Sequence, residues 1–90
     1  MQIKWTKRAS NNLDKVLSHI AQDNKNASKK FLAETLKKVG FLEEFPLLGR
    51  AGIVADTREL VIHENYIVYY RIRDEQVQIL RLLHVKRQYP

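Results

Sequence analysis

Three apolar runs fill the last third of the chain and predict three neighbouring β-strands. The runs read TRELVI, YIVYYRI and VQILRLLHV, and the polar breaks HEN and RDEQ separate them. They are rich in Val, Ile, Leu and Tyr, residue types that suit a pleated, half-buried surface. Because each break is only a few residues long, neighbouring runs can pair only as antiparallel hairpins. We therefore expect a three-stranded antiparallel meander.

The last run predicts a strand that is apolar on both faces. Strict alternation would place on one face Val77, Ile79, Arg81, Leu83 and Val85. The opposite face would carry Leu80, Leu82, His84 and Lys86. Such a strand is usually central in its sheet and covered on both faces. We therefore expect helices on one face and another element, such as a partner protein, on the other. Arg81 within it should be either ion-paired or functional.

The start of the chain predicts a short strand and then a helix. Ile3 and Trp5 alternate with polar residues, so residues 2–6 should form an edge strand of the same sheet. Thr6 or Ser10 can cap the following helix, because either hydroxyl can accept a bond from a free backbone N–H. The helix should end near Gln22, and its apolar face recurs at the helical spacing in Leu13, Val16, Leu17 and Ile20.

A second helix should follow a tight polar turn. The turn reads AQDNKNAS, and Asn24 or Asn26 is the expected cap of a helix whose apolar stripe is Phe31, Leu32, Leu36 and Val39. Pro46 stops the helix, and the two acidic residues before Phe45 suggest that regular helix ends ahead of them. The loop PLLGRAGI then displays Arg50 between two glycines. The prediction is one α+β domain over residues 1–90, with a helical hairpin on a four-stranded, mainly antiparallel sheet.

Composition narrows the functional classes. The 90 residues carry a formal net charge of +6, which favours acidic partners, either nucleic acid or an acidic protein. There is no cysteine, so thiol chemistry and cysteine-zinc sites are excluded. The chain shows neither a signal-peptide core nor a membrane span, which predicts a cytoplasmic protein without a membrane partner.

The residues that could carry out catalysis are few. The three histidines, His19, His63 and His84, lack the spacing of a metal site, so we expect no metal and no cofactor. Metal-free RNA cleavage would need a base, an acid and cations for the developing phosphorane charge. The groups that could supply these are Arg58, Arg81, His84, Arg87 and Tyr89. A histidine bonded to the backbone remains the common alternative for His84.

The order of the motifs identifies a family resemblance. TREL, YIVYYRI and ILRLLHVKRQYP, with PLLGR and two amphipathic segments before them, resemble the RelE/ParE superfamily of bacterial toxins from type II toxin–antitoxin pairs. The resemblance covers essentially the whole chain. It implies a toxin that is held inactive by a cognate antitoxin, whose C-terminal segment wraps around the toxin.

The resemblance leaves two activities to weigh. In the RelE branch, which cuts messenger RNA on the ribosome, the catalytic set is rich in lysine and arginine and includes a C-terminal tyrosine. Arg58 and Arg87 fall at positions of that set, but Leu60 and Ile67 replace a lysine and an arginine, and the chain ends before the tyrosine. Tyr89 could replace the tyrosine only if the tail bent differently. The pattern therefore looks more like the ParE branch, whose members poison DNA gyrase, with the RelE-like ribonuclease as the alternative.

Binding residues follow from the same interpretation. A gyrase poison needs a cationic, partly apolar surface, for which the candidates are Arg50, Arg71, Arg73, Arg81, Lys86 and Arg87. Leu80 and Leu82 are the candidates for the antitoxin contact, and both could equally belong to the core. A small basic nucleic-acid-binding module is a third interpretation, but the chain lacks the clustered aromatics of a single-strand binder.

Overall fold

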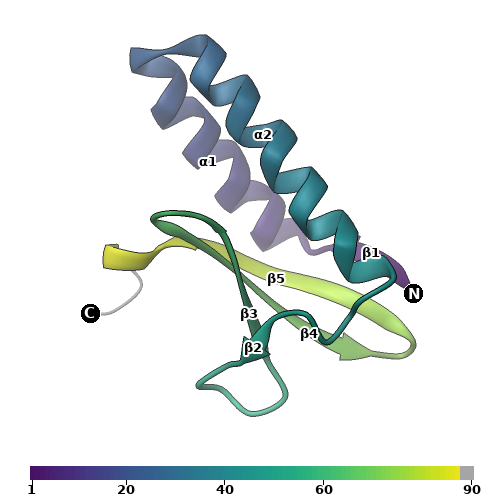
Figure 1. Cartoon of the computed structure of the whole chain (residues 1–90). Helices are drawn as coiled ribbons and strands as arrows, with labels where there is room; N and C mark the ends of the chain where they lie inside the picture. The colour runs from purple at the N-terminus through teal and green to yellow at the C-terminus, as the bar shows by residue number, and fades with distance from the viewer. Residues whose placement is uncertain (88–90) are drawn as a thin grey trace.

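Two helices cover one face of a five-stranded sheet (Figure 1). The computed structural model describes residues 1–87. The helices are α1 (Lys7–Asp23) and α2 (Lys25–Gly40), and single 3-10 turns follow at Phe41–Glu43 and Val85–Arg87. The strands are β1 (Gln2–Trp5), β2 (Arg50–Ala51), β3 (Arg58–His63), β4 (Tyr66–Arg73) and β5 (Gln76–His84). The α+β class, the helical hairpin and the meander are as expected. No helix among these residues is long and apolar enough to cross a membrane.

Side-chain caps place the two helices. Thr6 begins α1 by accepting a bond from the Ala9 amide at 3.2 Å, and Asn24 begins α2 by accepting one from the Ala27 amide at 3.0 Å. Asn24 alone separates the helices, so Ser10 and Asn26, the alternative caps, lie inside them. The helices therefore form a tight antiparallel hairpin.

The sheet has one more strand than the sequence predicts. Its order is β1-β5-β4-β3-β2, with β1 parallel to β5 at one edge and every other pair antiparallel. The added strand is β2, where Arg50 and Ala51 pair with β3 inside a segment expected to be only a loop. Gly49 permits this approach, because a Cβ there would lie 2.8 Å from the Glu59 carbonyl oxygen.

A bulge in β5 corrects the expected division of its side chains between the faces. Tyr69 pairs with Arg81 and Tyr70 with Ile79, so Leu80 is an extra residue in the ladder. The extra residue reverses the alternation, because a one-residue shift exchanges the two faces of a strand. Ile79 and Leu82 both enter the core, whereas Arg81 points to the opposite face. The prediction that Ile79 and Arg81 share a face is wrong for this reason.

The core lies between the helices and the sheet. The helices contribute Ala9, Leu13, Phe31 and Val39, and the 3-10 turn adds Leu42. The sheet contributes Ile62, Val68, Tyr70, Val77, Ile79 and Leu82. Burial of Leu13, Phe31 and Val39 follows the helical periodicity read from the sequence. The prediction is wrong for Leu36, which is 49% exposed, because the neighbouring Thr35 occupies the buried position of α2 instead.

Tyr70 anchors the segment that leads from α2 to β2. Its side chain is fully buried, and its hydroxyl donates to the Pro46 carbonyl at 2.7 Å and accepts from the Gly49 amide at 2.9 Å. Burial raises the pKa of Tyr70, while the Gly49 bond and the charge of Arg58 act in the opposite direction. The phenol therefore fixes the position of the loop relative to the sheet.

Replacing Tyr70 by phenylalanine should destabilise the fold by about 1–3 kcal/mol, because the buried Gly49 amide and Pro46 carbonyl lose their partner. Urea unfolding of the two proteins measures this difference. Tyr66→Phe is the control, since the structure shows no hydrogen bond from that hydroxyl, and its effect should stay within about 0.5 kcal/mol. Equal losses in both variants would contradict the anchoring role.

The same phenol predicts a pH dependence. The pKa of Tyr70 is raised above 10.0, so above pH 10 the unfolded chain loses a proton that the folded state keeps. The stabilising contribution of the phenol is therefore complete below pH 10 and decreases as the pH rises. The difference in unfolding free energy between the wild type and Tyr70→Phe should shrink between about pH 8 and about pH 11. A difference that stays constant or grows would show that the folded state does not favour the neutral phenol.

Candidate functional site

Four polar side chains form a row across the sheet on the face away from the helices. Arg50, Glu59, Tyr69 and Arg81 are successive cross-strand partners on β2, β3, β4 and β5. Directly paired residues point to the same face, and the alternating neighbours of this row belong to the core. We call this face the outer face.

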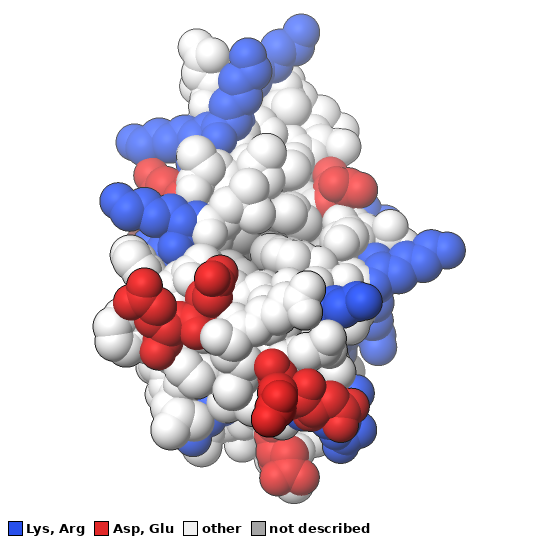
Figure 2. Space-filling model, turned by 90° about the vertical axis from the view of Figure 1, so that its right-hand side faces the viewer, with Lys and Arg blue, Asp and Glu red and all other residues white. Residues whose placement is uncertain are grey.

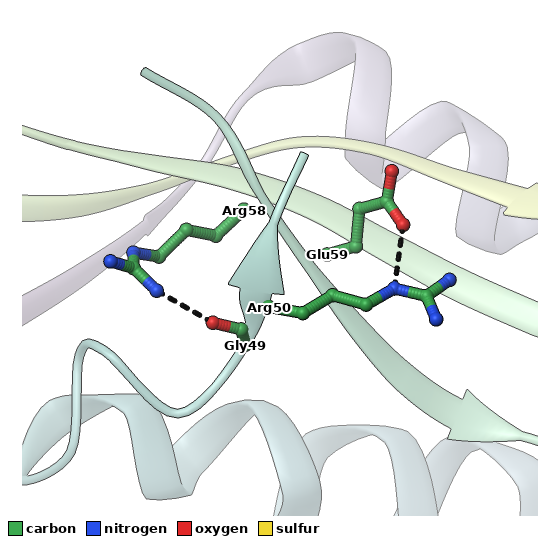
Figure 3. A network of polar contacts seen from close by, with 4 residues as sticks. All are labelled: Gly49, Arg50, Arg58 and Glu59. Carbon is green, nitrogen blue, oxygen red and sulfur yellow. Dashed lines mark hydrogen bonds and ion pairs between the residues drawn. The ribbon is translucent and has the colours of Figure 1, made fainter. Parts of the chain in front are cut away.

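The carboxylate in the row is already neutralised. Glu59 is only 6% exposed, and its Oε1 accepts from Arg50 Nε at 2.9 Å (Figure 3). A buried carboxylate needs such a partner, because an unpaired charge inside a protein is costly. The pairing uses Arg50, one of the predicted target-binding residues, for a structural contact.

Arg81 lies at the other end of the row without a comparable partner. Its Nε is buried and has no hydrogen-bond partner among residues 1–87. No ion pair of Arg81 appears among residues 1–87, so of the two expectations for this residue, ion pairing is not observed. A buried N–H of a guanidinium that lacks an acceptor is uncommon and requires an explanation.

A hollow of about 560 Å³ opens beside Arg81, and we call it the outer hollow. Leu80 and Leu83 of β5 line it together with Ile53 and Val54 of the loop between β2 and β3. Ile53 and Val54 are 79% and 68% exposed, more than any other large apolar side chain that the structure describes. The hollow therefore combines apolar walls with the cationic side chains of Arg8 and Arg81. Sequence reasoning overlooked Ile53 and Val54, although two aliphatic residues in a loop were a visible signal.

Three arginines surround a second hollow of about 420 Å³, the arginine hollow. They are Arg58, Arg71 and Arg73, and Asp56 also lines the space. Arg58 donates to the Gly49 carbonyl at 2.7 Å, and Figure 3 shows that it lies on the opposite side of β2 from the Arg50 side chain. Arg71 donates to Gln78 Oε1 at 2.7 Å. These bonds hold two of the three guanidinium groups in fixed positions.

The residues proposed for RNA cleavage do not converge in the described structure. Arg81 lines the outer hollow, whereas Arg58 lines the arginine hollow. His84 packs edge-on against Tyr66, with ring centroids 5.0 Å apart, and its Nδ1 accepts from the Lys86 amide. Tyr89 lies outside the described residues, as does the side chain of Arg87. No group of three or more His, Asp or Glu residues within residues 1–87 is arranged to bind a metal.

The predicted binding residues separate into distinct places. Arg71 and Arg73 meet at the arginine hollow, and Lys86 lies exposed in the turn after β5. Leu80 lines the outer hollow, which keeps it available to a partner. Leu82 is 1% exposed in the core, so its assignment as an antitoxin contact is corrected. The bulge at Leu80 is the reason that these two leucines have different environments.

Charge is distributed unevenly over the surface. Figure 2 shows the side of the molecule on which the N-terminus lies, with most of the acidic groups in its lower half and most Lys and Arg in its upper half and at its margins. This side is therefore not a continuous cationic surface, despite the net charge of +6. The arginine hollow is instead a local concentration of positive charge.

Comparison with protein families gives a match over nearly the whole chain. Residues 3–89 match the model of the family described as "ParE toxin of type II toxin-antitoxin system, parDE". A protein of Sinorhizobium fredii that is named as a toxin, Y4kP, is 38% identical over 90 residues, covering 99% of this chain and 93% of its own. Toxin RelE2 of Caulobacter vibrioides is 31% identical over 86 residues, covering 96% of this chain and 97% of its own.

Solved structures support the same relationship. A chain of the chromosomal ParDE toxin–antitoxin system from P. aeruginosa superimposes with a TM-score of 0.85 at 25% identity, covering 94% of this chain and 96% of that one. The E. coli DinJ-YafQ toxin–antitoxin complex contains a chain with a TM-score of 0.59 at 14% identity, covering 99% and 97%. The second likeness shows a shared fold. These findings confirm the resemblance that the motifs indicated.

The Arg50–Glu59 pair should contribute measurably to stability. Arg50→Met would leave the Glu59 carboxylate nearly buried without its partner, and we expect a loss of about 1–2 kcal/mol, below the value for fully buried pairs because Arg50 is exposed. Adding Glu59→Gln should recover part of this loss, which urea unfolding of the double-mutant cycle measures. The exposed Lys30–Glu34 pair, 4.0 Å apart, serves as the control cycle. Equal coupling energies in the two cycles would contradict the importance of burial.

Proposed function

Because the chain belongs to the ParE toxin family of type II toxin–antitoxin systems, we propose that it inhibits DNA gyrase by binding and that a cognate antitoxin neutralises it. The observation that carries the gyrase assignment is the replacement of two cationic positions by Leu60 and Ile67. Both side chains are apolar. Leu60 packs against the core and Ile67 is only 3% exposed, so neither position can offer a cation to a substrate. A toxin that acts by binding needs no proton-transfer groups at these positions.

The separation of the remaining candidates supports the same proposal. Arg58 pairs with Tyr70, and His84 pairs with Tyr66, four residues away along β4. Four residues of antiparallel strand extend over roughly 14 Å. Acid–base catalysis requires its groups within hydrogen-bond reach of one reacting phosphate, directly or through one water. This spacing is unfavourable for joint action of Arg58 and His84.

The arginine hollow is the surface that best fits gyrase, or gyrase with its DNA. Arg58, Arg71 and Arg73 concentrate positive charge there, and Ile72, which is 36% exposed, adds apolar surface. Clustered cations accelerate association with an acidic surface and position it. Binding at this surface would trap the cleaved gyrase–DNA complex and thereby block replication.

An antitoxin would cover the outer face. The helices occupy the other face of the sheet, and the outer hollow exposes aliphatic side chains that a soluble protein normally covers in a complex. The P. aeruginosa ParDE system and the E. coli DinJ-YafQ complex are both toxin–antitoxin assemblies of the same fold.

A ribosome-dependent ribonuclease is the second candidate. The name of the Caulobacter relative, Toxin RelE2, favours it, as does the presence of Arg58 at a position of the RelE catalytic set. It would require Arg58, Arg81 and Arg87 to act with His84 or Tyr89 in an active site that forms on the ribosome.

Two assays on purified, antitoxin-free protein distinguish the candidates. We expect loss of gyrase supercoiling with accumulation of cleaved DNA, and intact messenger RNA on programmed ribosomes. Cleaved messenger RNA with unaffected gyrase would instead establish the ribonuclease and refute the inference drawn from Leu60 and Ile67.

Charge removal at the arginine hollow tests the proposed gyrase contact. Arg71→Gln with Arg73→Gln should raise the half-inhibitory concentration about 5- to 10-fold and reduce its salt dependence, because steering charges are lost. The matched control is Lys29→Gln with Lys37→Gln, which removes the same charge from exposed positions of α2. Equal effects of the two double variants would assign the inhibition to net charge rather than to this hollow.

A further inference from the structure

We propose that the outer hollow receives an acidic side chain of the antitoxin, whose carboxylate binds the guanidinium of Arg81 between two aliphatic walls. The inference rests on the proposed neutralisation by an antitoxin and specifies the chemistry of that contact. It identifies Arg81 as a specificity-determining residue of the antitoxin interface.

The unmatched donor at Arg81 is the first step of the argument. Its Nε is buried and has no hydrogen-bond partner within the described part of the chain, although an arginine normally directs its planar set of N–H donors at an acceptor. A carboxylate fits this set in a bidentate manner through two parallel N–H···O bonds. The free toxin thus lines the hollow with an arginine whose N–H donors are not all satisfied, and an arriving carboxylate would supply the missing acceptor.

Within residues 1–87, no carboxylate that lines the outer hollow is available for this role. Glu59 is the single acidic residue that lines it there, and Arg50 already binds it at 2.9 Å. Tyr69 lies between Glu59 and Arg81 in the cross-strand row, so the Cα atoms of these two residues are separated by two strand spacings, about 10 Å. Arg50 and Glu59 pair at one end of the row, and Arg81 at the other end remains available for a carboxylate of the partner.

The walls of the hollow specify the neighbours of that carboxylate. Ile53 and Val54 form the loop side, and Leu80 and Leu83 form the strand side. Arg8 also lines the hollow. Because Arg50 already neutralises Glu59, Arg8 and Arg81 leave the hollow with an excess of positive charge. The complementary ligand is a peptide segment in which aliphatic side chains flank one Asp or Glu.

The two hollows differ in the partner that each can accept. A nucleic-acid backbone requires exposed cations along its path, and the arginine hollow provides these. The outer hollow places the Arg81 side chain, whose Nε is buried, beside aliphatic walls, which suits a protein side chain that leaves water completely. Its volume of about 560 Å³ lies within the range of about 300–1,000 Å³ that is usual for ligand pockets.

Arg81→Met is the direct test, with the antitoxin encoded together with this toxin as the probe. The dissociation constant should rise about 100-fold, since one partner of a desolvated charge pair is removed. The free variant should be at least as thermostable as the wild type, because the substitution removes a donor that is unsatisfied in the free toxin. A purely structural role predicts the opposite, a loss of stability. Lys29→Met, on the exposed side of α2, is the control and should bind normally.

A pair of substitutions at Val54 provides an independent test in an exposed loop. Val54→Glu and Val54→Lys remove the same apolar contact, but the glutamate also repels an incoming carboxylate. We expect the glutamate variant to bind the antitoxin at least about 10-fold more weakly than the lysine variant. Equal affinities of the two variants would overturn the acidic nature of the ligand.

The partner residue can be found by changing each Asp and Glu of the antitoxin to its amide. One amide variant should weaken binding as much as Arg81→Met does, and combining the two changes should add little further loss. Additive losses for every pair would refute the direct contact. If Arg81→Met retains wild-type affinity, this inference fails while neutralisation by the antitoxin stands. If the wild-type toxin does not bind the antitoxin, the proposed neutralisation itself fails.

Discussion

The bulge at Leu80 is the constraint on which both faces of the sheet depend. Without the extra residue, Ile79 and Arg81 would point in the same direction, and the strand could not complete the core without burying a guanidinium under the helices. With it, Ile79 and Leu82 both pack against the helical hairpin while Arg81 joins Tyr69 on the outer face. One inserted residue thus separates the stabilising part of β5 from its polar part.

The cross-strand row converts that geometry into an asymmetric charge arrangement. The cross-strand neighbours of Glu59 are Arg50 and Tyr69, and β2 brings Arg50 Nε within 2.9 Å of the Glu59 carboxylate. The short strand β2 forms because Gly49 approaches the sheet closely and Tyr70 holds the preceding loop through Pro46 and Gly49. The neutralisation of Glu59 is therefore a consequence of how the loop after α2 is anchored.

Separate hollows allow the two proposed partners to use different chemistry. The arginine hollow offers exposed charge, which favours rapid association with an acidic target. The outer hollow offers aliphatic surface and one desolvated donor, which favours slow dissociation of a permanent partner. A toxin that is held inactive and later acts on a large complex needs both properties.

The sequence by itself determined the elements and their class. Helical spacing from Leu13 to Ile20, the polar break at Asn24 and the short polar links between the last three runs are local signals, and local signals fix helices and hairpins. The motif order also sufficed to identify the toxin superfamily, which the family comparison confirmed. The apolar residues at Leu60 and Ile67 were readable without coordinates.

Only the tertiary structure decided which side chains meet. A bulge leaves little trace in the alternation of a strand that is apolar on both faces, so the core position of Leu82 and the outward direction of Arg81 could not be read from the sequence. The pairing of Glu59 with Arg50 depends on β2, a two-residue strand that forms through contacts with distant residues. Local patterns specify elements, whereas the partner of a buried charge depends on the packing of the whole chain.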